Sequence, residues 1–259
     1  MTGNVAGLAA KSGGGVIATG RFSSGPDVLD VDDALTPLAG YEITGLPTPV
    51  MVLADGAPAV LGGGLWRWDG TWKQVTNASL TTAVLPDADG GIVFATWMAD
   101  AVDEVTRWSA GGVESLGTLP ASPVRLGVLD GELVALAASQ TYEVWMRHDG
   151  AWGLLPSPDD ALWDLIVSPV LGLVVTGERA TWRWDGAGWQ MLAATGGQAR
   201  ACSDGVLTVD HGIATFTDGT TTATIQLPDV NFFEIEPAHD GLYIGRFGDS
   251  GASIRRFGL

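Results

Sequence analysis

The sequence has few of the residues on which covalent, metal-based or nucleic-acid-binding chemistry usually depends. It holds one cysteine, three histidines, and 13 lysines and arginines against 30 acids, for a net charge of −17. A lone Cys202 excludes an internal disulfide, and we expect it to act as a small buried apolar residue. The histidines lack metal-ligand spacing, and no Gly-x-Ser-x-Gly nucleophile motif occurs. We therefore expect no metal and no cofactor, and we assign no catalytic residue.

Positive charge is scarce, with only two lysines in the chain. A strongly acidic surface repels phosphate backbones and anionic lipids, so we expect neither a nucleic-acid nor a membrane partner. No apolar run approaches the ~20 residues of a membrane span, and the first residues lack the basic and apolar segments of a secretion signal. We expect a soluble protein made in the cytoplasm. A virus particle is one further destination that needs no signal peptide.

Apolar residues and glycine, in contrast, are abundant. Hydrophobic residues make up 46% of the 259 residues, 37 residues are glycine, and only 17% are charged. This composition argues against disorder, which requires low hydrophobicity and high charge. The length suits one closed all-β domain, so we expect residues 1–259 to form a single domain.

A repeat of about 38 residues is the strongest pattern in the sequence. Its first element is a short apolar strand that follows a tight turn. The seven copies begin after positions 15, 58, 91, 132, 172, 205 and 241. Continuous apolar runs of this kind are typical of strands that are buried on both faces.

The second element of the repeat is an alternating, aromatic strand that ends in a sharp turn. Its clearest copies begin the segments Trp66–Trp72 and Trp182–Trp189, which include the turn that follows the strand. The seven copies of the strand end at positions 31, 68, 108, 148, 184, 217 and 257. Asp-Gly, the preferred type I′ hairpin turn, occurs nine times, either before the apolar strand or after the aromatic one. The repeat is therefore expected to be a four-stranded meander with tight turns between strands 1 and 2 and between strands 3 and 4.

Four-stranded units at this period predict an all-β, seven-bladed β-propeller, with six blades as the alternative. A β-sandwich would show turns about every 8–12 residues without the longer period. The seventh copy of the aromatic strand ends at Phe257, close to the last residue of the sequence. We expect the last blade either to have three strands or to receive a fourth from a protein partner or a second copy of the chain.

The repeat resembles a degenerate kelch unit, of the type found in the central domain of galactose-oxidase-like propellers. The segment Leu61-Gly62-Gly63, followed by Trp66 and Trp72, matches the kelch pattern fully. Trp152 and Trp189 keep the later tryptophan in two other repeats. The resemblance implies a propeller that is mostly used for binding. Enzymes of the galactose-oxidase type need a copper site of two tyrosines, two histidines and a cysteine, which this sequence does not match.

The connections between strands 2 and 3, and between one blade and the next, are expected on one face of the disc, where longer loops carry function. Gly-Arg-Phe occurs at this corner in both the first and the last repeats, which are neighbours in a closed ring. We expect an acidic partner group to bind the arginines, with aromatic rings in apolar contact. The candidate binding residues are Arg21, Phe22, Trp97, Arg179, Arg246 and Phe247. The alternative is that these arginines only pair with nearby acids.

Tryptophan does not by itself indicate sugar binding in this chain. Most of the 11 tryptophans occupy equivalent positions of the repeat, so we expect them to pack within and between blades. Trp97 and Trp163 fall outside that pattern. Trp97, in the loop expected at residues 97–100, is the best candidate for an exposed aromatic side chain.

Three classes of function stay open. The first, which we favour, is a non-enzymatic binding or structural module that docks a protein partner on the loop-bearing face, for example within a virus particle or a larger assembly. The second is a carbohydrate-binding, lectin-like propeller that uses aromatic residues on that face. The third is a hydrolase or lyase with loop carboxylates as general acid and base. The carboxylates considered are those of Asp100, Asp103, Glu104 and Glu143.

Overall fold

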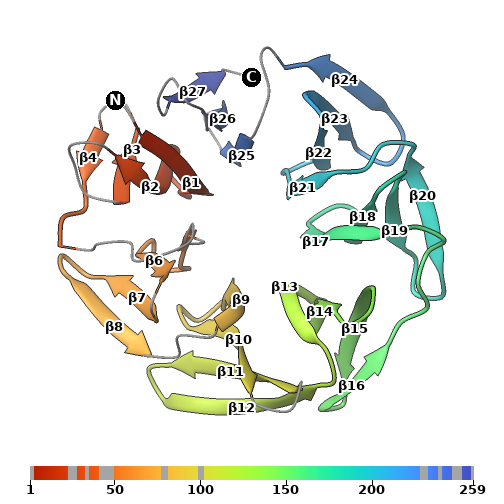
Figure 1. The fold of residues 1–259 in the computed structure, drawn as a ribbon, viewed down its shortest axis with the longest axis horizontal. Coiled ribbons are helices and arrows are strands. Elements are labelled where there is room, and N and C mark those ends of the chain that lie inside the picture. Colours follow the sequence, from red (N-terminus) through yellow and green to blue (C-terminus); the bar gives the residue numbers. More distant parts are fainter. Residues whose placement is uncertain are drawn as a thin grey trace.

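The computed structural model describes residues 3–22, 28–32, 35–40, 50–62, 64–76, 81–98, 102–227, 233–238, 241–246 and 253–257. Its elements are all β-strands, and they form seven antiparallel sheets arranged round a central axis (Figure 1). Within these ranges no helix occurs, and hence none that is long and apolar enough to cross a membrane. The expected all-β propeller architecture is confirmed.

Each sheet is a meander whose strands follow the chain order outward from the axis (Figure 1). The innermost strands are β1 (Gly3–Ala10), β5 (Val50–Val52), β9 (Thr81–Pro86), β13 (Ser122–Leu129), β17 (Leu162–Ser168), β21 (Gln198–Ala201) and β25 (Phe233–Ala238). The second strands are β2 (Val16–Phe22), β6 (Pro58–Leu61), β10 (Ile92–Met98), β14 (Glu132–Ala138), β18 (Gly172–Gly177), β22 (Val206–Asp210) and β26 (Gly241–Arg246). These second strands are the apolar elements of the repeat.

The outer part of each sheet contains the aromatic element. The third strands are β3 (Val28–Val31), β7 (Leu65–Trp68), β11 (Val102–Ser109), β15 (Tyr142–His148), β19 (Thr181–Trp184), β23 (Ile213–Thr217) and β27 (Ser253–Phe257). The fourth strands are β4 (Leu35–Pro37), β8 (Trp72–Thr76), β12 (Gly112–Leu119), β16 (Ala151–Leu154), β20 (Trp189–Ala193) and β24 (Thr222–Gln226). Six sheets are therefore complete four-stranded blades, and the last repeat forms a smaller sheet of three described strands, β25–β27.

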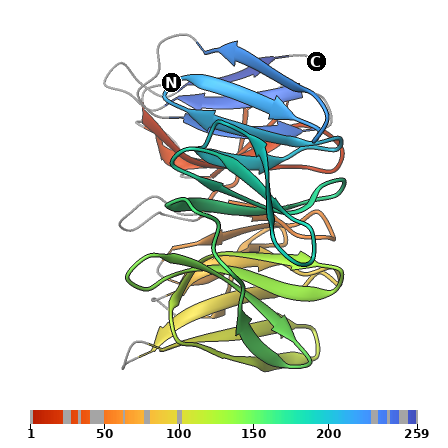
Figure 2. The same ribbon diagram turned by 90° about the vertical axis from the view of Figure 1, so that its right-hand side faces the viewer.

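The strands run between the two faces of the disc, as the edge-on view in Figure 2 shows. We call the face with the connections between second and third strands, and between successive sheets, the loop face. The opposite face bears the tight turns between strands 1 and 2 and between strands 3 and 4, and we call it the turn face. Because every sheet has the same meander order, equivalent strand ends all reach the same face.

The apolar core lies between neighbouring sheets rather than in one central mass. Ile17 and Val28 of the first sheet, for example, pack with Val60 of the second, and Trp66 and Trp72 lie against this cluster. Trp68 and Trp72 tilt against each other with ring centroids 5.2 Å apart, and Trp184 and Trp189 repeat the same geometry. The expectation that most tryptophans pack in the architecture is confirmed for these pairs.

The ring closes by packing between the first and last sheets. Tyr243 of β26 is buried in one cluster with Val5 of β1 and Val16 of β2. The Ala10 backbone N–H also donates to Glu236 Oε1 of β25 at 3.1 Å. The two ends of the described ring are thus joined by apolar contact and a hydrogen bond.

The turn prediction is only partly correct. Asp130-Gly131 and Asp149-Gly150 have positive φ at both residues, as a type I′ turn requires. At Asp55-Gly56, only the glycine has positive φ. The Gly56 N–H donates to the Leu53 carbonyl, and the Leu53 N–H donates to the Ala57 carbonyl. There the loop contains an extra residue, Ala54, which favours a type I turn followed by a left-handed glycine.

Candidate binding pocket and loop face

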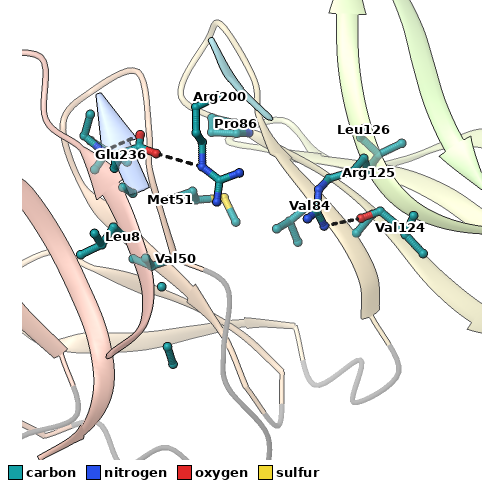
Figure 3. Close-up of a pocket in the computed structure, with 16 residues that line it drawn as sticks. Leu8, Val50, Met51, Val84, Pro86, Val124, Arg125, Leu126, Arg200 and Glu236 are labelled. Atoms are coloured by element: carbon teal, nitrogen blue, oxygen red, sulfur yellow. Dashed lines mark hydrogen bonds and ion pairs between the residues drawn. The ribbon is translucent and has the colours of Figure 1, made fainter. Parts of the chain in front are cut away.

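A pocket of about 520 Å³ lies at the centre of the ring, between the innermost strands. Its walls include apolar side chains from four sheets, among them Leu8, Val50, Met51, Val84 and Leu126. Two arginines and one glutamate supply its charged groups among the described residues (Figure 3). The volume and the mixture of apolar walls with a few polar groups are typical of small-ligand and peptide side-chain sites.

Arg125 of β13 is one of the two arginines. Its Nε donates to Oδ1 of Asp164 at 2.6 Å, and its Nη1 donates to the Val124 carbonyl at 3.0 Å. Asp164 belongs to β17 of the next sheet, and its side chain is only 2% exposed. A buried carboxylate needs such donors because burial without partners is costly. Asp164 also accepts from the backbone N–H groups of Leu165 and Ala199, at 3.0 and 3.1 Å.

Arg200 of β21 continues this set of contacts around the ring. Its Nη1 lies 3.8 Å from Asp164 Oδ2, and its Nε lies 3.5 Å from Glu236 Oε2 of β25. Figure 3 shows its side chain projecting between Glu236 and Arg125. We call Arg125, Asp164, Arg200 and Glu236 the polar chain. Through the Ala10–Glu236 hydrogen bond, it links the innermost strands of five successive sheets.

The charges around the pocket balance, although the whole chain is strongly acidic. Its charged lining residues are Arg125, Arg200 and Glu236, whereas Asp164 lies behind them in the wall. The side chain of Arg125 is 47% exposed, and within the described part of the chain no interaction occupies its Nη2. A guanidinium that is fixed at two nitrogens and open at the third is prepared to bind an anionic group.

An innermost strand has an exposed tryptophan near its loop-face end, outside the pocket lining. Trp163 is the second residue of β17, immediately before Asp164, and it is 61% exposed. The pairing register of β17 with β18 shifts between Leu162 and Asp164, so Trp163 is the extra residue of a β-bulge. Bulges redirect side chains, which explains why a large ring leaves the packed face of the strand. The sequence placed Trp163 outside the repeat pattern, but Trp97 was the residue predicted to be exposed.

Arg179 follows β18 on the same face, where the sequence placed it. Its Nε lies 3.5 Å from Asp160 Oδ1, its Nη2 donates to the Asp159 carbonyl, and its side chain remains 65% exposed. Burial tends to raise the pKa of Asp160, but hydrogen bonds from Trp182 Nε1 and the N–H groups of Arg179 and Ala180 outweigh it and lower the pKa. Arg179 is therefore held by nearby acids, as in the alternative we considered, and still faces solvent.

The other predicted binding residues are located by their backbone alone or fall outside the described residues. Arg21 and Phe22 are the last residues of β2, and Arg246 is the last residue of β26, so these strands end on the loop face. β1 packs against both β25 and β26, which confirms that the first and last repeats are neighbours. Trp97 lies near the loop-face end of β10, its side chain is not described, and Phe247 lies outside the described residues.

The carboxylates considered for the hydrolase or lyase alternative are not in the pocket lining that the structure describes. Asp103 is fully buried in β11 and accepts from Ser122 Oγ at 3.1 Å, and Glu104 accepts from Ser115 Oγ at 2.6 Å. Glu143 lies in β15, a third strand, and Asp100 falls outside the described residues. Across the described ranges, no three histidine, cysteine or acidic side chains gather closely enough to hold a metal ion.

The polar chain was missed in the sequence, although a signal for it exists. Its four residues lie 39, 36 and 36 residues apart, which follows the repeat period. The two repeat elements recognised in the sequence are the second and third strands, whereas these residues occupy the first. A search for charged residues that recur at the repeat period in short apolar strands would have located the strands that line the central pocket.

Comparisons with known proteins agree on the fold. No protein-family model and no curated protein sequence matches the chain. Among solved structures, the extracellular domain of the putative one component system BT4673 from B. thetaiotaomicron is similar, with a TM-score of 0.72 and 11% identity. That match covers 99% of this chain and 41% of the other, so this chain spans less than half of it.

Two further structures are similar over most of both chains. Catalytically inactive virginiamycin B lyase from Staphylococcus aureus, with quinupristin, has a TM-score of 0.69 at 12% identity, covering 100% of this chain and 96% of the lyase. YCF48 bound to a peptide has a TM-score of 0.58 at 13% identity, covering 89% and 79%. Identities this low establish the β-propeller fold alone, and none of these matches assigns the repeat to the kelch family.

Proposed function

We propose that this chain is a non-enzymatic binding module that docks a protein partner on its loop face. The observation that carries the proposal is the exposed Trp163, which a β-bulge turns outward near the loop-face end of an innermost strand. Tryptophan and arginine are the residues most enriched among interface hot spots. One propeller of similar fold, YCF48, has been solved bound to a peptide.

We include the seam of the ring in this docking surface. In the proposal, the three-stranded sheet serves as the seventh blade, and Arg21, Phe22, Arg246 and Phe247 lie with Trp97 and Arg179 around the same face. The support is that β2 and β26 both end on the loop face, in sheets that pack against each other. A kelch-type origin of the repeats would be consistent with this use.

The pocket chemistry favours binding over catalysis, despite the likeness to a lyase. Among the described lining residues, Glu236 is the one carboxylate, and it is engaged by Arg200 and the Ala10 N–H. The described histidines, His148 and His211, are highly exposed and do not line the pocket. General acid–base chemistry needs a titratable group within reach of the reacting atoms.

Selection of peptides from a random phage-displayed library on the immobilised protein tests the proposal. Selected peptides should bind wild-type protein and lose at least about tenfold in affinity with Trp163→Ala, because hot-spot truncation costs more than about 1.4 kcal/mol. Met191→Ala is the matched control, because Met191 is 60% exposed but lies in the outermost strand β20. Failure to select any peptide, or equal losses with both variants, would overturn the proposal.

The carbohydrate-binding alternative is supported by Trp163 as one exposed aromatic ring on the loop face. A glycan array separates the two functions. Retention of a defined glycan by wild-type protein, lost with Trp163→Ala and kept with Met191→Ala, would replace the protein-partner proposal. Whether the chain belongs to a virus particle or another assembly depends on which partner it binds. The sequences of the phage-selected peptides would help to identify that partner.

The outer edge of β27 is a second place for a protein partner. β27 pairs with β26, and among the described residues no fourth strand covers its other side, in contrast to the six complete sheets. Exposed strand edges can accept an added strand through backbone hydrogen bonds. We propose self-association of two copies at this edge. Sedimentation velocity tests it, and a strict monomer at all concentrations would exclude it.

A further inference from the structure

We propose that the central pocket binds a carboxylate that is attached to an apolar group, with Arg125 as the residue that receives the carboxylate. The inference deepens the proposed function, because it names the chemical class of partner group that enters the pocket. It rests on three features of the described residues: the state of the Arg125 guanidinium, the local charge, and the apolar walls.

The first feature is the fixed orientation of Arg125. Its Nε and Nη1 are held by Asp164 and by the Val124 carbonyl, so the guanidinium plane cannot turn freely. No described residue occupies Nη2, and the side chain is 47% exposed within the pocket lining. Little conformational entropy is then lost when Nη2 donates to a ligand oxygen.

The second feature is the local charge. Arg125 and Arg200 face the cavity, Glu236 is the one described acidic lining residue, and Asp164 lies buried behind them, so the polar chain is neutral. Elsewhere the chain has a large excess of acids, with a net charge of −17. An anionic group is therefore repelled by the acidic surface elsewhere, whereas at the pocket it meets arginine donors and no net negative charge, which favours a single orientation of the ligand.

The third feature is the apolar wall around the arginines. Leu8, Val50, Met51, Val84 and Leu126 all line the cavity. A cavity of about 520 Å³ accommodates an aromatic or branched aliphatic group next to the carboxylate. A fully hydrated anion such as inorganic phosphate would leave these walls without contact, so the apolar carboxylate fits the site better. In a peptide, such a group is a C-terminal carboxylate beside an apolar side chain, or an acidic side chain beside one.

Titration with 4-phenylbutyrate and with its uncharged analogue 4-phenylbutyramide tests the inference. The two probes share the phenyl ring and differ in charge, and binding is followed by ligand-observed saturation-transfer NMR on the full chain. We expect the carboxylate to bind at least about tenfold more tightly than the amide, since a charge-assisted hydrogen bond is lost in the amide. Arg125→Ala should remove that preference, and Arg125→Lys should restore part of it because it restores the charge.

Arg107→Ala is the matched control, because Arg107 of the third strand β11 also pairs through Nε with an aspartate, Asp87, but does not line the pocket. It should leave both affinities unchanged. Equal binding of the two probes, an unchanged preference in Arg125→Ala, or absence of binding at millimolar concentration would overturn the inference. Should Arg125→Ala unfold, the comparison of the two probes on wild-type protein and the Arg125→Lys variant still decides the question.

The outcome is separable from that of the proposed function. Phage-selected peptides that depend on Trp163, but bind equally after amidation of the C-terminus and replacement of acidic residues by their amides, would overturn this inference and leave the docking proposal standing. Arg125-dependent binding of 4-phenylbutyrate with no selectable peptide would do the reverse. The two peptide changes also distinguish a terminal carboxylate from an acidic side chain.

Discussion

Arg125 and Asp164 face each other across two neighbouring blades, with Nε of the arginine 2.6 Å from Oδ1 of the aspartate. The arginine is half exposed in the pocket, whereas the aspartate is almost completely buried. Arg125 therefore faces the cavity, whereas Asp164 is buried in the wall behind it. Asp164 also accepts from Ala199 N–H of the following blade, so it joins three successive innermost strands.

Replacement of Asp164 by asparagine should therefore destabilise the fold. The variant loses the buried negative charge that offsets Arg125 and Arg200, and its amide N–H₂ replaces an acceptor beside two N–H donors. We expect a loss of about 2–4 kcal/mol in the free energy of unfolding, measured by urea denaturation. Asp159→Asn is the control, since the Asp159 side chain is fully exposed. Equal midpoints for the two variants would show that the polar chain contributes no stability.

The seam between first and last sheets should be sensitive to added volume. A Cβ atom at Gly245 of β26 would lie 2.7 Å from Val5 Cγ1 of β1, inside a buried cluster. We expect Gly245→Ala to lower the free energy of unfolding by about 1–3 kcal/mol, the usual cost of overpacking. Thermal unfolding followed by circular dichroism measures it.

Gly153→Ala provides the comparison for that experiment. Gly153 also lies in a strand, but a Cβ atom there would come no closer than 3.9 Å to the Met146 carbonyl oxygen. Its melting temperature should stay close to that of wild-type protein. If Gly245→Ala had the same melting temperature as Gly153→Ala, the first and last sheets would not be packed as described.

Acid should weaken the turns that hold aspartates with lowered pKa values. Asp218, in the turn after β23, accepts hydrogen bonds from the backbone N–H groups of Thr221 and Thr220 and from both threonine hydroxyls, which hold its pKa well below the ordinary 3.8. A group whose pKa is lower in the folded state stabilises the protein above its unfolded pKa and loses that contribution as pH falls through the folded value.

The stability difference between wild-type protein and Asp218→Asn should therefore be constant at neutral pH and should shrink as the pH falls below 3.8. Urea midpoints measured from neutral pH downward give this difference directly. Asp204→Asn serves as the reference, because Asp204 is exposed in another turn. A difference that grows on acidification would contradict the hydrogen-bonded geometry of the turn.

Cys202 should react slowly with alkylating agents. Burial, together with the negative charge of Asp204, raises the pKa of its thiol to about 11, and the residue packs against the cluster between the last two sheets. At mildly alkaline pH, iodoacetamide should modify the folded protein roughly 100-fold more slowly than the urea-unfolded protein, because the thiolate is the reactive form. Mass spectrometry follows the reaction. Comparable rates in the two states would contradict the burial of the thiol.

The repeat was predictable because its signals are local. Apolar second strands, aromatic third strands and Asp-Gly turns each occupy a few consecutive residues, and each recurs with the blade. Trp68 and Trp184 illustrate this, since the same tilted pair forms with the tryptophan that follows each of them in its own blade. The six complete blades and the smaller seventh sheet follow from the same pattern.

The pocket was not predicted because its chemistry arises between blades. Arg125 and Asp164 meet only when two first strands lie side by side, and bulges before both residues shift the alternation of their strands by one position. Alternation along β17 alone therefore gives no indication that Trp163 faces solvent while Asp164 is buried. The Arg179 prediction identified the correct face, but the acids that hold this arginine, Asp159 and Asp160, were not identified in the sequence.

A crystal structure of the full chain with a phage-selected peptide tests the central proposal most directly. We predict that the peptide lies on the loop face against Trp163, with a carboxylate oxygen within hydrogen-bond distance of Arg125 Nη2 and an apolar group against Met51 and Leu126. A peptide bound to the turn face or to an outer strand, with the pocket filled only by water, would contradict the account.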